Sequence, residues 1–168
     1  MLIFNDMPVN LEQFKKNAHN AKAVNKKFLQ QLKKVNSRNL DDTVHALHDE
    51  VFEEIDCLQC ANCCKTTSPI FYQKDIERLA KHFRIKPQHF IEQYLHIDED
   101  QDYVLNMAPC PFLLKDNYCS VYDSRPTACR EYPHTKRKKF FQITELTYRN
   151  TMVCPAVLEI VNRLKKVF

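Results

Sequence analysis

Half of the cysteines in this 168-residue chain lie in one short run, where Cys57, Cys60, Cys63 and Cys64 fall within eight residues. Two C-x-x-C steps share Cys60, so three sulfurs can converge on one metal ion or cluster. Side chains of adjacent residues diverge in a helix and in a strand, so Cys64 is expected to point away from Cys63. We therefore expect Cys64 to serve a second metal or to bridge within a multinuclear site.

The other cysteines raise the number of sulfurs to eight and are Cys110, Cys119, Cys129 and Cys154. A structural zinc ion takes four ligands, so eight thiolates suit two all-cysteine zinc sites. Four thiolates can instead hold an iron–sulfur cluster and leave four for another role. We predict that all eight cysteines ligate zinc or iron, the latter as an ion or an iron–sulfur cluster, in two metal sites or one multinuclear site.

The first three cysteines, at positions 57, 60 and 63, have the spacing of the bacterial ferredoxin run. The fourth cysteine of that run is absent, because Thr67 stands at its position. Cys110 and Cys154 are each followed by proline, and either one can supply the remote ligand. The spacing alone leaves zinc and iron–sulfur chemistry both open.

Disulfides are the main alternative use of so many cysteines, and the expected cellular compartment argues against them. Residues 1–6 carry no basic stretch typical of a signal peptide, and no uninterrupted apolar run reaches membrane-spanning length. We therefore expect a cytoplasmic protein with no membrane partner. In a reducing cytosol such spacings more often bind metal than form disulfides.

Two further motifs follow the cysteine run in a fixed order: Cys-Pro-Phe-Leu at 110–113 and Arg-Pro-Thr-Ala-Cys-Arg at 125–130. Together with the run, they resemble the CxxCxxCC family, also called YkgJ-like, of cysteine-cluster proteins. The resemblance extends from about Cys57 to Cys154. It implies chelation of zinc or iron by the cysteines and leaves the cellular role undefined. Ala61 and Asn117 stand at turn positions where the family pattern leads us to expect glycine.

The chain contains no glycine, although average usage predicts about 12 in this length. Phosphate-binding loops, dinucleotide fingerprints and nucleophile elbows all require glycine, so these three motifs are excluded. Asparagine tolerates the left-handed backbone region best after glycine, and we expect Asn62 and Asn117 to adopt it.

The segment before the cysteine run predicts two amphipathic helices. Apolar residues recur every three or four positions from Leu11 to Val35, interrupted only by Asn25. Residues 11–36 carry seven lysines and one glutamate, whereas residues 41–56 carry seven acids and no Lys or Arg. We predict an N-terminal helical hairpin over residues 1–56, its second helix capped by Asp41 or Asp42. Because Asn25 occupies a core position, self-association through the first helix is an alternative.

The remainder, residues 57–168, is predicted to be one cysteine-cluster domain nucleated by metal. We expect helices from Ser68-Pro69 to Phe83, after Pro87, and over 155–167. Strands at 103–107 and 118–122 would form a small hairpin. The fold class is therefore mainly α with a small β-hairpin.

Several cationic and aromatic residues accompany the cysteines of this domain: Lys65, Arg125, Arg130, Tyr122 and Tyr132. Metal held by four thiolates carries net negative charge, which nearby cations offset. Two arginines beside tyrosines can alternatively bind an anionic substrate.

Three classes of function follow. The first is a metal-binding protein without catalytic residues, because no second catalytic group stands at a diagnostic spacing. The second is an iron–sulfur enzyme, because the pattern is also similar to the cysteine-rich part of flagellin lysine methylases. The third is a zinc-stabilised nucleic-acid binder that uses the basic run at 136–139, for which a solvated loop is the simpler interpretation.

Overall fold

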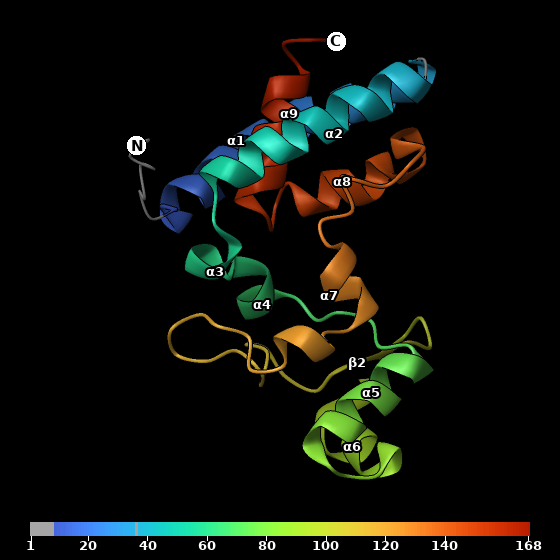
Figure 1. The fold of residues 1–168 in the computed structure, drawn as a ribbon. Coiled ribbons are helices and arrows are strands. Elements are labelled where there is room, and N and C mark those ends of the chain that lie inside the picture. Colours follow the sequence, from blue (N-terminus) through green and yellow to red (C-terminus); the bar gives the residue numbers. More distant parts are fainter. Residues whose placement is uncertain (1–8, 36) are drawn as a thin grey trace. The chain divides into compact units, whose positions relative to one another are not determined.

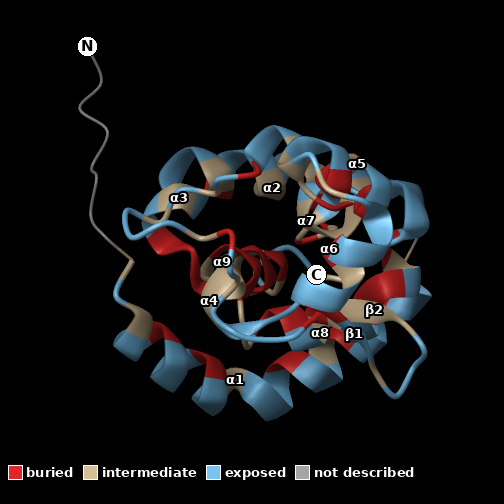
Figure 2. Cartoon of the chain, turned by 90° about the horizontal axis from the view of Figure 1, so that it is seen from below, coloured by how far each residue is buried: buried red, intermediate tan, exposed pale blue. Residues whose placement is uncertain are grey.

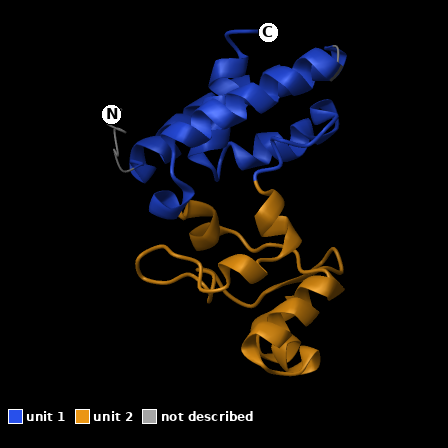
Figure 3. Cartoon of the chain, in the orientation of Figure 1, with its two compact units in different colours: residues 1–60, 133–168 blue, residues 61–132 orange. Residues whose placement is uncertain are grey.

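The computed structural model describes residues 9–35 and 37–168, the side chain of Ser37 excepted, and shows a mainly helical chain with one two-stranded sheet (Figure 1). This confirms the predicted fold class. The chain divides into two compact units (Figure 3): unit 1 comprises residues 1–60 and 133–168, and unit 2 comprises residues 61–132. The predicted domains, 1–56 and 57–168, stay a prediction.

Unit 1 is built from α1 (Leu11–Gln31), the 3-10 turn η1 (Leu32–Lys34), α2 (Ser37–Glu54), α8 (Thr144–Asn150) and α9 (Pro155–Leu164). Asn10 caps α1, because its side chain accepts a hydrogen bond from the Gln13 N–H at 3.0 Å. The predicted apolar stripe faces inward, with Phe14, Ala18 and Asn25 buried. The two predicted N-terminal helices form, and their main packing partners are α8 and α9.

α9 forms the centre of unit 1, and most of its residues are buried (Figure 2). α2 packs against it, and α1 packs against both α8 and α9. Lys165 Nζ, after the end of α9, donates to Asn25 Oδ1 at 2.8 Å, and Asn25 is fully buried. The stripe of α1 thus contributes to the core of its own unit, while self-association through it stays a prediction.

The predicted cap of the second helix is wrong, because α2 already begins at Ser37. The Asp41 carboxylate instead accepts hydrogen bonds from the Lys139 and Phe140 N–H groups, at 2.7 and 2.8 Å. These groups lie at the start of the 3-10 helix η3 (Phe140–Ile143). Asp41 therefore joins α2 to the segment that follows the basic run.

Unit 2 contains α4 (Asn62–Thr66), α5 (Gln73–Phe83), α6 (Pro87–Tyr94), β1 (Leu95–Ile97), β2 (Tyr103–Leu105), the 3-10 turn η2 (Tyr122–Ser124) and α7 (Thr127–Glu131). Its core is aromatic: Phe90 and Phe112 are buried with ring centroids 6.1 Å apart, and Phe83 stacks on both. The short helix α3 (Cys57–Cys60) precedes α4 and belongs to unit 1.

Three local predictions for unit 2 are corrected. α5 begins at Gln73 and not at Ser68, because Phe71 forms a β-bridge with Tyr103. β2 pairs antiparallel with β1, so the predicted strand 118–122 is reduced to a single bridge between Leu113 and Cys119. The third correction concerns the left-handed turns. Asn117 (φ 67°) adopts that region as predicted, whereas Ala61 (φ 46°) adopts it in place of Asn62.

Within the described residues, no helix combines the length and apolar character needed to cross a membrane.

Candidate metal centre

The eight cysteines are divided between the two compact units. Unit 1 holds three of them, Cys57, Cys60 and Cys154. Unit 2 holds the other five, which are Cys63, Cys64, Cys110, Cys119 and Cys129. None of the eight forms a disulfide. The short cysteine run therefore contributes to both units.

In unit 1, Cys57 and Cys60 are the first and last residues of α3, and Cys154 immediately precedes α9. Cys57 is exposed, whereas Cys60 and Cys154 are buried. Burial raises the pKa of the Cys154 thiol to about 12, and the nearby Cys57 and Cys60 thiols raise it further. These three side chains are thus close enough to influence one another's ionisation.

Cys154 is held in place by its backbone. Its N–H donates to the Asn150 carbonyl at 2.8 Å, and its own carbonyl accepts from the Leu158 N–H at 3.1 Å. Pro155 occupies the first helical position of α9, where its fixed φ suits a helix start. N–H groups of Ala156 and Val157 favour the ionised form of the thiol, although burial outweighs them.

In unit 2, the thiols of Cys110, Cys119 and Cys129 are grouped around Cys64 of α4. The Cys110 N–H donates to the Cys64 carbonyl at 2.8 Å, and the bridge to Leu113 holds Cys119 on the neighbouring strand segment. Cys129 lies on α7. Burial raises the pKa of Cys110 to about 11 and of Cys129 to about 12, and the pKa of Cys119 also rises. Cys64 contributes to all three increases, so these four sulfurs share one electrostatic environment.

Cys64 differs from the other thiols of unit 2. The sulfurs of Cys63 and Cys64 lie 4.0 Å apart, closer than expected from diverging neighbours. A hydrogen bond from Cys63 lowers the pKa of Cys64 to about 7, against the effect of burial, and the charges of Arg125 and Lys65 assist. Cys64 thus ionises more readily than Cys110, Cys119 or Cys129.

Over residues 9–35 and 37–168, no three His, Cys, Asp or Glu side chains converge closely enough to hold a metal ion as they stand. The donor chemistry nevertheless fits a soft or borderline metal, since each unit gathers several thiols and the thiolate is the form that ligates zinc and iron. Binding on this arrangement requires the sulfurs to draw together and lose protons.

The predicted companion residues have different partners. Arg125 lies over Tyr122, with its guanidinium carbon 3.5 Å from the ring centroid, and its Nε donates to the Tyr122 carbonyl at 2.8 Å. The Nε of Arg130 donates to the Arg125 carbonyl at 3.0 Å and not to a thiol. Tyr132 follows α7, and its N–H donates to Ala128. Arg125 and Lys65 are therefore the two cations shown to act on Cys64.

The sequence analysis missed Asp75 and Arg78 of α5, which position the segment that carries Arg125 and Cys129. Asp75 is fully buried, and its Oδ1 accepts hydrogen bonds from the N–H and Oγ1 of Thr127 at 3.1 and 3.0 Å. Arg78 donates to the carbonyls of Ser124 and Arg125, at 3.2 and 2.6 Å. Both residues lie outside the motifs, and their spacing of three along α5 is the only sequence signal they carry.

The basic run of unit 1 contacts α2. Lys136 Nζ lies 2.5 Å from the Asp49 carboxylate, and His48 Nδ1 lies 2.6 Å from Thr135 Oγ1. Burial lowers the pKa of His48, and the charge of Lys136 adds to this effect. The segment is thus a loop in contact with an acidic helix.

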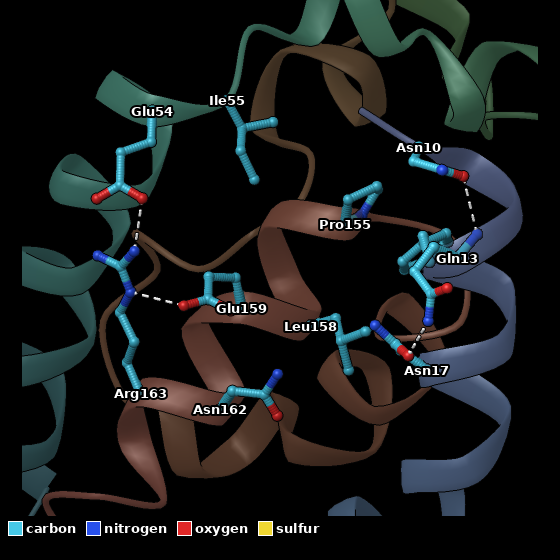
Figure 4. A pocket seen from close by; sticks show the side chains of 11 residues that line it. Asn10, Gln13, Asn17, Glu54, Ile55, Pro155, Leu158, Glu159, Asn162 and Arg163 are labelled. Atoms are coloured by element: carbon cyan, nitrogen blue, oxygen red, sulfur yellow. Dashed lines mark hydrogen bonds and ion pairs between the residues drawn. The ribbon is translucent and has the colours of Figure 1, made fainter. Parts of the chain in front are cut away.

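Unit 1 also has an open groove of about 370 Å³ between α1 and α9 (Figure 4). Its polar side chains already bond to one another: Gln13 donates to Asn17, and Arg163 donates to Glu54 and Glu159. No cysteine is among the residues that line the groove.

The fold and the thiols are those of a mainly helical, cysteine-rich protein. The family model CxxCxxCC, described as a putative zinc- or iron-chelating domain, matches residues 56–154, and the chain belongs to this family. No curated protein and no solved structure matches the chain.

Proposed function

We propose that this protein binds zinc or iron through two separate thiolate groups, one in each compact unit. Unit 1 would use Cys57, Cys60 and Cys154. Unit 2 would use the thiol of Cys64 and the three thiols grouped around it, which are those of Cys110, Cys119 and Cys129. The family match supports the metal, and the division of the thiols between units supports two sites.

The observation that carries the two-site proposal is the placement of these thiols in separate compact units. Cys154 responds to Cys57 and Cys60, whereas Cys129 responds to Cys64, Cys110 and Cys119. Four thiolates complete a tetrahedral site. Three thiolates leave one position for a further ligand, as in zinc sites with three protein ligands.

Metal binding has a direct physical consequence for both units. Cys110, Cys129 and Cys154, whose pKa values are raised to about 11 or 12, must lose their protons to ligate, so binding releases protons and the affinity falls as the pH falls. Since the thiols come from segments distant in sequence, bound metal also contributes to the free energy of folding.

The proposal is tested by metal content and visible absorption of protein purified without oxygen and without added metal. We expect two metal ions per chain. Zinc without colour would indicate closed thiolate sites, and iron with sulfide and a charge-transfer band would indicate an iron–sulfur centre. Absence of both metals from well-folded protein would contradict the proposal.

Single substitutions separate the two sites. We expect Cys60→Ser to lose the metal of unit 1 alone and Cys129→Ser to lose the metal of unit 2 alone. His45→Asn is the matched control, because His45 is a potential ligand in α2 whose Nε2 instead lies 3.5 Å from the Arg137 carbonyl oxygen. If either cysteine variant lost all metal while remaining folded, a single multinuclear site would replace two separate ones.

A further inference from the structure

We propose that Arg125, stacked on Tyr122, binds the carboxylate of a small ligand with a flat apolar body, beside the thiols of unit 2. The ligand is distinct from the metal, and its site lies wholly within unit 2.

Arg125 is fixed in place before any ligand arrives. Its carbonyl accepts hydrogen bonds from Arg78 Nη2 at 2.6 Å and from Arg130 Nε at 3.0 Å. Its own Nε donates to the Tyr122 carbonyl at 2.8 Å, and the guanidinium carbon lies 3.5 Å from the centroid of the Tyr122 ring. The plane of the guanidinium is therefore set, which lowers the entropy lost when it binds a partner.

The outer nitrogens of this guanidinium are available. Among the described residues, no hydrogen bond or ion pair involves Nη1 or Nη2 of Arg125. Arg78 differs, because its Nε, Nη1 and Nη2 all donate to protein acceptors. Arg163 differs as well, because it pairs with three glutamates. Two parallel N–H donors of a planar fork match the two oxygens of a carboxylate.

Exposed aromatic surface lies next to the fork. Tyr118 and Tyr122 are 48% and 40% exposed, and their ring centroids lie 6.1 Å apart with an angle of 30° between the ring planes. Leu114, whose N–H donates to the Tyr118 carbonyl, is also 49% exposed. These side chains offer a platform for the apolar body of the ligand, since aromatic rings favour offset contacts with other flat groups.

Arg125 acts on the thiols through its charge and still has the capacity to bind an anionic ligand. Its charge acts on Cys64 and Cys119, but no ion pair joins it to any acidic side chain in the described part of the chain. Lys65 acts on Cys64 too. The position of Arg125 between thiols and tyrosines suits a ligand whose carboxylate faces the cysteine group and whose ring lies over the tyrosines.

The test is NMR titration of the metal-free full chain with benzoate, benzamide and inorganic phosphate, following the Arg125 side-chain N–H and the tyrosine rings. We expect saturable shifts with benzoate and none with benzamide, which lacks the charge. Arg125→Lys keeps the charge but loses the fork, and we expect it to weaken benzoate binding at least tenfold. Arg84→Lys is the matched control, because Arg84 is an exposed arginine of the same unit.

Tyr118→Ala provides a second variant that leaves Arg125 and its contacts intact, and we expect it to weaken benzoate several-fold. Unchanged benzoate binding in Arg125→Lys would overturn the proposal. Phosphate binding as tight as that of benzoate would overturn the carboxylate assignment. Metal content measured on each variant as purified, before its metal is removed for the titration, separates this site from the proposed metal sites, because we expect the charge-preserving Arg125→Lys to retain its metal.

Discussion

Replacement of Asp75 tests how unit 2 holds the segment that carries Arg125 and Cys129. The Asp75 carboxylate accepts four hydrogen bonds: from the Tyr72 N–H at 3.2 Å, from Thr127 N–H and Oγ1, and from Arg78 Nη2 at 2.5 Å. Burial opposes its ionisation, but these bonds together hold its pKa below the ordinary value. We expect Asp75→Ala to destabilise the metal-free protein strongly.

The magnitude follows from what the substitution leaves behind. Breaking a buried ion pair costs about 3–5 kcal/mol, because the remaining partners stay desolvated. The Arg78 side chain is 31% exposed and can regain some hydration, so we take the lower end, about 3 kcal/mol. Asp75→Asn keeps the shape and one acceptor oxygen, and we expect it to cost about 2 kcal/mol.

The assay is urea denaturation followed by circular dichroism, with Glu77→Gln as the control on the exposed side of α5. The control should change the free energy of unfolding by less than about 0.5 kcal/mol. Because the pKa of Asp75 is lowered by folding, its stabilising effect is present above about pH 4 and is lost as the pH falls below that value. A cost below about 0.5 kcal/mol for Asp75→Ala would refute this account of the anchor.

Two further predictions concern unit 1. Asp41→Ala should lower the free energy of unfolding by about 1–2 kcal/mol, because two N–H groups at the start of η3 lose their acceptor. Urea denaturation measures this change, with the exposed Asp42→Ala as the control. Equal effects of the two substitutions would contradict the prediction. The metal-free chain should lose thermal stability as the pH rises above 9, because the folded state keeps the proton on Cys154, whose pKa is about 12, while the unfolded thiol ionises near its ordinary value of 9.0. Between pH 8 and pH 10, the melting temperature should fall less in Cys154→Ala than in the exposed Cys57→Ala. An equal fall in both variants would count against the assignment of this pH dependence to Cys154.

The sequence predicted the elements with strong periodic patterns. The stripe from Leu11 and the proline that opens α6 both led to helices that the structure contains. The start of α5 was predicted five residues too early, because Ser68-Pro69 resembles a helix start while the following Phe71 pairs with Tyr103 across the chain. Long-range pairing of this kind leaves no local signal.

The candidate site, like the fold, could be predicted from the sequence only in part. Cysteine spacing and motif order were sufficient to predict the family, which the match to residues 56–154 confirms. The grouping of particular cysteines was not predictable, since Cys154 approaches Cys57 and Cys60 only through the packing of α9. The role of Asp75 was hidden for a similar reason, because its main partner Thr127 lies 52 residues away.

The boundaries of the family match explain why the two thiol groups depend on different parts of the chain. Unit 2, residues 61–132, lies wholly inside the matched segment, together with its five cysteines. In unit 1 the match begins at residue 56 and ends at Cys154, so α1, α2 and α9 lie outside it. Yet α9, which begins directly after Cys154, packs against α1 and α2. Part of the packing beside the unit 1 thiols is therefore supplied by helices outside the matched segment.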